Sequence, residues 1–189
     1  MKNILVIGAG RSAVTLIKYL LDNAEVNNWN VIVADFSEEL AKQAVSNHPN
    51  AKAIFFNVTD AVQREHEITA ADIIISMLPT TMHIRVAEDC VRLGKNLVTA
   101  SYVSKEILDL DEKAEKAGVL LLNEIGLDPG IDHMSAMQVI DQIKENGGEL
   151  TSFKSFCGGL VHPDYDNNPW NYKFTWNPRN VVLAGQGTA

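Results

Sequence analysis

A glycine-rich turn near the start of the chain has the residue spacing of a dinucleotide-binding loop. The apolar run Ile4–Ile7 leads directly into the pattern G-x-G-x-x-A, formed by Gly8-Ala9-Gly10-Arg11-Ser12-Ala13. In such loops the first glycine permits a tight turn, the second leaves room for a pyrophosphate, and the small last residue lets helix and strand pack closely. The N–H groups of the following helix, about Ser12–Leu21, would bind the phosphates. A glycine turn without a ligand is the alternative interpretation.

An acidic residue, Asp35, ends the second apolar run, 25 residues after Gly10. Its carboxylate is placed to accept a hydrogen bond from an adenosine ribose 2′-hydroxyl. A carboxylate there would repel the 2′-phosphate of NADP, and neighbouring Phe36 and Ser37 supply no cation to bind one. We therefore predict NAD as the preferred cofactor and keep NADP as the alternative, because Arg11 is a cation within the loop. The alternative is that Asp35 has a structural role only, as a solvated residue at the strand end or as a helix cap.

A second group of ionisable side chains lies in residues 123–133. Three carboxylates and a histidine fall within ten residues: Glu124, Asp128, Asp132 and His133. The segment follows the sixth apolar run, and ligands of open α/β sheets bind at the carboxyl ends of the strands. The same residues also suit a turn followed by a solvated first helical turn. We predict no metal site, because no pair of His or Cys residues has the spacing of zinc ligands.

Short apolar runs alternate with helix-length segments, which indicates how these groups are positioned. The runs are Ile4–Ile7, Val31–Val33, Ala53–Phe56, Ile73–Ile75, Asn96–Val98 and Val119–Leu122. They are apolar on both faces, as in a buried parallel sheet. Helices are predicted from Thr80 or Thr81 to Gly94, from Ser104 to Gly118, and from Ile131 to Gly147. The order predicts an α/β fold with a Rossmann-type, doubly wound parallel sheet.

The composition excludes several classes of protein. A net charge of −8 argues against nucleic-acid and anionic-membrane partners, because phosphates recruit Lys and Arg. No apolar stretch is long enough to span a membrane, and the N-terminal run is too short for a signal peptide. With 46% apolar residues the chain is an ordinary globular protein. Two cysteines are too few for a disulfide scaffold, so we expect a reduced, cytoplasmic setting.

The composition changes near residue 150. The last 39 residues hold only five of the 40 charged residues but seven of the 13 aromatic residues. Such an apolar segment needs a covering surface. We therefore predict a dinucleotide-binding domain in residues 1–125 and, in residues 126–189, the beginning of an α+β substrate and dimerisation domain that is incomplete in this chain. Self-association as a homodimer is one way to bury the segment.

Three blocks of sequence make a resemblance specific. Asn123–Met134, Thr99–Tyr102 and Ser155–Leu160 are similar, in order and spacing, to segments of the saccharopine dehydrogenase family, and so are Asn168-Pro169 and Tyr172–Trp176. After Gly159-Leu160, however, family members usually continue Pro-Ala-Pro-Glu, whereas this chain has Val161–Asp164. The resemblance covers essentially the whole chain and implies a nicotinamide-linked oxidoreductase with a small amino-acid substrate.

The implied reaction acts on the CH–NH bond of a secondary amino acid. Family enzymes interconvert saccharopine with glutamate and 2-aminoadipate 6-semialdehyde through an imine. Two alternatives stay open: a related imine-forming dehydrogenase of a polyamine or opine, and a nucleotide-binding module without turnover. We expect the 189 residues alone to bind the cofactor without catalysing the reaction.

The resemblance also implies roles for individual residues. The cofactor set is Gly8, Gly10, Arg11, Ser12, Ala13, Asp35, Phe36, Ser37, Val58, Thr59, Pro79, Leu127, Asp128, Pro129 and Arg179. The substrate set is Ser101, Tyr102 and Asp128, and the groups nearest the chemistry are Asp128, Cys157 and Tyr102. His83, at the start of a helix, is interpreted as structural because the sequence shows no partner for it, and Cys90 is interpreted as a core residue.

Overall fold

The computed structural model describes residues 1–156 and 160–173 of the 189-residue chain. The chain divides into two units, Met1–Met137 and Gln138–Ala189. The predicted division after residue 125 lies ahead of this boundary and stays a prediction. Since the two units are separate bodies, each is described by itself.

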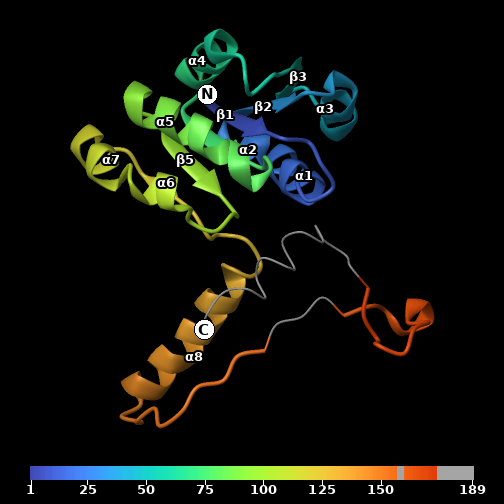
Figure 1. The fold of residues 1–189 in the computed structure, drawn as a ribbon. Coiled ribbons are helices and arrows are strands. Elements are labelled where there is room, and N and C mark those ends of the chain that lie inside the picture. Colours follow the sequence, from blue (N-terminus) through green and yellow to red (C-terminus); the bar gives the residue numbers. More distant parts are fainter. Residues whose placement is uncertain (157–159, 174–189) are drawn as a thin grey trace. The chain divides into compact units, whose positions relative to one another are not determined.

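The first unit is built on one six-stranded sheet (Figure 1). All strand pairs are parallel, and the order is β3-β2-β1-β4-β5-β6. The strands are β1 (Lys2–Ile7), β2 (Trp29–Asp35), β3 (Ala51–Phe55), β4 (Ile73–Ser76), β5 (Asn96–Thr99) and β6 (Leu121–Leu122). This order reverses between β1 and β4, which is the point where doubly wound sheets bind ligands. The predicted sheet is confirmed.

Helices connect the strands and continue beyond the last one. They are α1 (Val14–Asp22), α2 (Ala24–Asn27), α3 (Glu38–Val45), α4 (Ala61–Ala70), α5 (His83–Leu93), α6 (Lys105–Leu108), α7 (Asp111–Ala117) and α8 (Ile131–Glu145). Two short 3₁₀ turns, η1 (Thr80–Met82) and η2 (Pro163–Tyr165), complete the described elements. Gly94 and Gly118 end α5 and α7 with positive φ, as predicted for C-terminal glycines.

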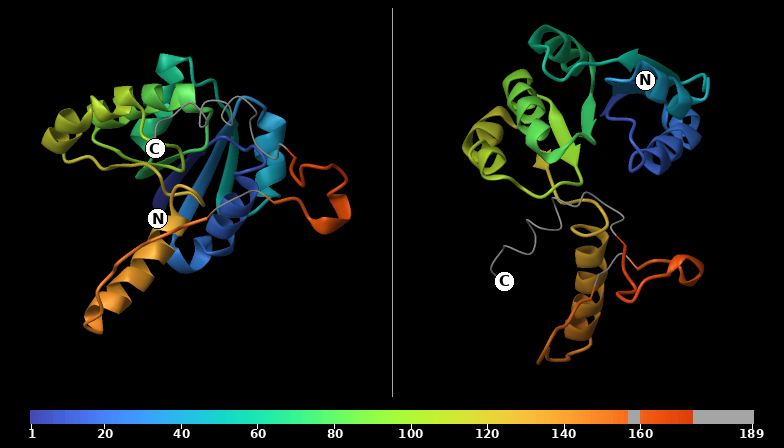
Figure 2. Two further views of the ribbon diagram at one scale, coloured as in Figure 1. Left: turned by 60° about the horizontal axis from the view of Figure 1, so that its bottom comes forward. Right: turned by 45° about the vertical axis from the view of Figure 1, so that its right-hand side comes forward.

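Two apolar cores lie on opposite faces of the sheet, each under its own helices (Figure 2). One core joins side chains of α1 and α3, such as Ile17 and Val45, to the sheet. The other joins α4, α5 and the α6–α7 corner through side chains such as Ile68, Val86 and Leu110. Burial on both faces explains why the strands read as continuous apolar runs rather than as alternating ones.

Two details of the predicted helices differ from the structure. No threonine side chain caps α5; Thr80 and Thr81 instead belong to η1, and the helix begins after Met82. The segment predicted as one helix from Ser104 to Gly118 divides into α6 and α7. Ser104 does cap the first of them by accepting a hydrogen bond from Ile107 N at 3.3 Å. The division buries Leu110 at the corner.

The second unit begins within α8, a helix that has no buried residue. After it, residues 146–156 form no helix or strand. Apolar side chains such as Val139, Leu150 and Trp170 are exposed. Among the residues that the structure describes, no helix is long and apolar enough to span a bilayer.

Candidate functional site

The glycine loop follows β1 at the carboxyl edge of the sheet, where the strand order reverses. Gly8 has φ +107°, and a Cβ added there would lie 2.8 Å from the carbonyl oxygen of Met77, the residue after β4. Met77 N in turn donates to Ile7 O at 2.8 Å. The loops after β1 and β4 are therefore in direct contact, and only glycine fits at position 8 without a shift.

The rest of the loop is open. A Cβ at Gly10 would have no neighbour within 4 Å. The backbone N–H groups of Gly10, Arg11 and Ser12 have no hydrogen-bond partner in the described part of the chain. They precede α1, whose first residues add further free N–H groups and the positive end of the helix dipole, and no side chain caps this end. Such an arrangement suits an anion such as a pyrophosphate.

Asp35 joins two loops at this edge. Its Oδ2 accepts a hydrogen bond from Ala9 N at 2.7 Å, and its Oδ1 accepts one from Ser37 N at 2.8 Å. Both carboxylate oxygens thus hold backbone groups, one in the glycine loop and one ahead of α3. Phe36 is 72% exposed and packs at 5.5 Å, between ring centroids, against Phe55.

The loop after β3 is held by a buried ion pair. Arg64 of α4 donates from Nε to Asp89 Oδ2 of α5, and from Nη1 to the carbonyl oxygen of Val58, both at 2.7 Å. Arg64 and Asp89 side chains are only 10% and 11% exposed. Val58 is buried, whereas Thr59 is exposed and bonded to Asn57 Oδ1. Arg64 therefore fixes the position of Val58, a predicted cofactor residue.

The segments that follow β5 and β6, called the motif segments below, are hydrogen-bonded to each other. Glu124 N donates to Ser101 O, and Glu124 Oε1 accepts from Val103 N, both at 3.1 Å. A Cβ at Gly126 would lie 3.0 Å from that of Ala100. Glu124 has φ +62°, an unusual conformation for a non-glycine residue. Two of the sequence blocks that carried the resemblance, Thr99–Tyr102 and Asn123–Met134, are thus neighbours in space.

A buried histidine links β4, α5 and the loop after β5. His83 Nδ1 lies 2.8 Å from Ser76 Oγ, and His83 Nε2 lies 2.8 Å from Ser101 Oγ. His83 is 1% exposed, and burial lowers the pKa of its imidazole, so the ring is neutral near pH 7. The structural interpretation of His83 overlooked this link, because serines 7 and 18 residues away give no signal in the sequence.

The remaining predicted site residues fall into two groups. Pro79, Tyr102, Leu127 and Asp128 are exposed residues of the loops after β4, β5 and β6, and Pro129 is buried. Cys157 and Arg179 lie outside the described residues. The structure therefore brings the predicted residues of the first unit to one edge of the sheet, but the roles assigned to them stay predictions.

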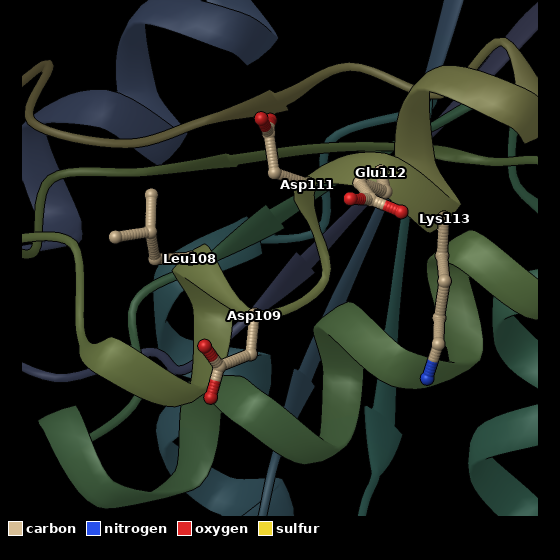
Figure 3. A pocket seen from close by; sticks show the side chains of 5 residues that line it. All are labelled: Leu108, Asp109, Asp111, Glu112 and Lys113. Carbon is tan, nitrogen blue, oxygen red and sulfur yellow. The ribbon is translucent and has the colours of Figure 1, made fainter.

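A surface hollow of about 400 Å³ lies elsewhere, at the corner between α6 and α7 (Figure 3). Its lining contains none of the predicted site residues and consists of Leu108, Asp109, Asp111, Glu112 and Lys113. Across the residues that the structure describes, no group of three or more His, Cys, Asp or Glu side chains is suited to a metal ion.

Cys90 is expected to resist alkylation in the folded protein. Burial raises the pKa of its thiol to about 12, with a further contribution from the charge of Asp89, so almost no thiolate forms at neutral pH. Iodoacetamide at about pH 8, followed by peptide mass spectrometry, should leave Cys90 unmodified in native protein and modify it in urea. Rapid modification of the native protein would contradict its assignment to the core.

Comparison with known proteins places the whole chain beside one family. Residues 4–122 match the saccharopine dehydrogenase NADP binding domain, and residues 126–189 match the saccharopine dehydrogenase C-terminal domain. The chain is 40% identical over its whole length to a saccharopine dehydrogenase (NADP(+), L-glutamate-forming) of Schizosaccharomyces pombe, of which it covers 41%. It is 43% identical over 168 residues to an alpha-aminoadipic semialdehyde synthase of Arabidopsis thaliana, covering 89% of this chain and 16% of that protein.

A solved structure agrees with these similarities. Apo saccharopine dehydrogenase (L-Glu forming) from Saccharomyces cerevisiae superposes with a TM-score of 0.84 and 39% identity, over 97% of this chain and 40% of that one. The chain thus spans about two fifths of the length of its fungal relatives. These fungal proteins are named for NADP(+), so the comparisons do not support the NAD preference predicted from Asp35 and Phe36; they support the NADP alternative.

Proposed function

Because this chain belongs to the saccharopine dehydrogenase family, we propose that it forms the coenzyme-binding part of an oxidoreductase that acts on the CH–NH bond of saccharopine. The products are glutamate and 2-aminoadipate 6-semialdehyde, formed through an imine. The observation that carries the proposal is the open glycine loop, whose N–H groups at residues 10–12 have no partner among the described residues, together with the two hydrogen-bonded motif segments. Both lie at the carboxyl edge of one parallel sheet.

The proposed coenzyme is NADP, and the loop residues fit it. The N–H groups of residues 10–12 and the first turn of α1 bind the pyrophosphate, for which Gly10 leaves space. Arg11 is the exposed cation of the loop and is assigned to the 2′-phosphate. Asp35 has both oxygens engaged with backbone N–H groups, which gives this carboxylate a role in loop structure that does not depend on a ribose hydroxyl. When bound, NADP accepts the hydride from the carbon next to the substrate amine.

The substrate is assigned to the loops after β5 and β6. Ser101 is half-buried just after β5. Tyr102, the next residue, is exposed, and so is Asp128 in the segment that is hydrogen-bonded to Ser101 through Glu124. Asp128 is proposed to orient the substrate amine electrostatically, since a carboxylate attracts an ammonium group. The 189 residues alone are expected to bind NADPH without turnover. The predicted homodimer and cytoplasmic location stay predictions.

Replacing Gly10 with valine should abolish coenzyme binding without unfolding the protein. The new side chain has open space in the protein itself but occupies the place proposed for the pyrophosphate. We expect the Kd for NADPH, followed by fluorescence titration at fixed salt, to rise at least about a hundredfold, equivalent to about 2.7 kcal/mol. Arg11→Ala should weaken NADPH binding more than NADH binding.

A control is Gly94→Ala, which changes an equally open glycine at the far end of α5, although its φ of +67° adds backbone strain that Gly10→Val does not carry. Its NADPH affinity should equal that of the unchanged chain. If Gly10→Val binds NADPH normally, the loop is a structural turn and the proposed coenzyme site is wrong. If NADH binds more tightly than NADPH, the assignment of Arg11 fails and Asp35 governs coenzyme choice.

A further inference from the structure

Three side chains form a hydrogen-bonded series, and the direction of both hydrogen bonds follows from one buried hydroxyl. Ser76 Oγ, His83 and Ser101 Oγ are linked by two contacts of 2.8 Å. Ser76 is fully buried, His83 is nearly so, and Ser101 is half-buried at the sheet edge. This hydrogen-bonded series therefore runs from the core to Ser101, a predicted substrate residue.

The direction of the first bond is set by the number of partners available to Ser76. In the described part of the structure, His83 Nδ1 is the one hydrogen-bond partner of Ser76 Oγ. If the hydroxyl accepted from Nδ1–H, its own proton would be buried without an acceptor, at a cost of about 1–3 kcal/mol. If it donates to Nδ1, its proton is paired and only lone pairs stay unused. Ser76 therefore donates.

The second bond then follows. A neutral imidazole that accepts at Nδ1 carries its proton on Nε2, and burial keeps this ring neutral near pH 7. His83 Nε2–H thus donates to Ser101 Oγ. The Ser101 hydroxyl uses a lone pair for this bond, and its own proton stays available to a ligand. The tautomer is assigned from the hydrogen-bond network, which is how such assignments are made.

We propose that His83 is a positioning residue that holds Ser101 as a hydrogen-bond donor toward a carboxylate oxygen of the amino-acid substrate. This rests on the proposed function, which places the substrate at Ser101. The backbone fixes the same residue from both sides: Ser101 N donates to Thr99 Oγ1 at 3.2 Å, and Ser101 O accepts from Glu124 N at 3.1 Å. His83 adds a constraint that the backbone does not supply, because its N–H occupies one lone pair of the hydroxyl and turns the hydroxyl proton away from the ring.

The tautomer is tested first, by nitrogen-15 NMR of His83 in the labelled chain. We expect a pyrrole-type resonance for Nε2 and a pyridine-type resonance for Nδ1. Ser76→Ala removes the donor to Nδ1 but leaves Ser101 as the acceptor for Nε2–H, so it should keep the proton on Nε2 and shift the Nδ1 resonance, whereas Ser76→Thr, which keeps a hydroxyl, should leave the Nδ1 resonance in place. A protonated Nδ1 in the unchanged chain, or an Nδ1 resonance that Ser76→Ala does not shift, would overturn the proposal.

The substrate is tested second, by titrating L-saccharopine in the presence of NADPH, which cannot oxidise it. Binding is followed at the backbone amide of Ser101. His83→Leu should raise the Kd for saccharopine at least about tenfold, and His83→Gln, whose amide N–H replaces Nε2–H, by less than about threefold. The Kd for NADPH should stay within about twofold in both variants.

These readouts separate the two proposals. A chain that fails to bind NADPH disproves the proposed function, while the tautomer of His83 is measured without any ligand. If NADPH binds but saccharopine does not perturb Ser101, or if His83→Leu binds saccharopine as the unchanged chain does, the positioning role of His83 is wrong.

Discussion

Replacing Asp89 with alanine is expected to lower the free energy of unfolding by about 3–5 kcal/mol. The change removes the partner of Arg64 Nε and leaves a guanidinium that is 10% exposed without its counter-charge. Alanine is a good helix former, so the loss does not come from helix propensity in α5. The measurement is urea denaturation of the unchanged chain and of Asp89→Ala. The two free energies of unfolding are compared at the same m value, the slope of free energy against urea concentration.

Two variants show whether the buried charge is the cause. Arg64→Met with Asp89→Ala removes both charges and should recover part of the lost stability, because no unpaired ion stays buried. Arg92→Ala removes a half-exposed partner of Asp89, bonded at 2.9 Å, and its surface pair with Glu65 at 3.2 Å, and should cost much less stability than Asp89→Ala. Equal losses in Asp89→Ala and Arg92→Ala would show that burial of the Arg64–Asp89 pair has no special weight.

Replacing Gly130 with alanine is expected to cost about 3 kcal/mol of stability and to disturb the start of α8. Gly130 has φ +145°, and an added Cβ would lie 2.2 Å from the carbonyl oxygen of Gly126. That oxygen also accepts from Ile131 N at 3.0 Å, while Gly126 N donates to Pro129 O at 2.8 Å. Since the clashing atoms are backbone, the turn itself must move.

Gly118→Ala is the matched control for this second variant. Gly118 also has positive φ, +64°, but a Cβ there meets no atom within 4 Å. Its replacement should cost only the left-handed strain of about 1 kcal/mol. Urea unfolding gives both values, and backbone amide shifts of residues 126–131 report the local change. A Gly130→Ala chain as stable as Gly118→Ala would mean that the turn rearranges freely.

The sheet could be predicted from the sequence because its signals are local. Each strand is a short apolar run, and the glycine loop, Gly94, Gly118 and the start of α8 follow from residues within a few positions of one another. The break at Leu110 could not be predicted, because both helices carry the same helical pattern, and the break serves the burial of one side chain in a distant core.

The site was predictable only in part, for a related reason. Residue type and spacing indicated that Asp35 ends its strand, and the structure places it there, whereas Ser101 was singled out only by the family resemblance. Which atoms they contact depends on pairs far apart in the sequence. Ser76, His83 and Arg64 become neighbours of site residues only when β4, α4 and α5 pack together.

The double hydrogen bonding of Asp35 has a consequence for protein engineering. A designer who wished to alter coenzyme choice would first exchange this carboxylate, yet the same exchange would release Ala9 and Ser37 and loosen the loop that is proposed to bind the pyrophosphate. Selectivity and loop order are thus tied to one side chain. The Phe36 side chain is exposed and packs against Phe55 rather than against the glycine loop. A cation can therefore be introduced at this position while the loop is left intact.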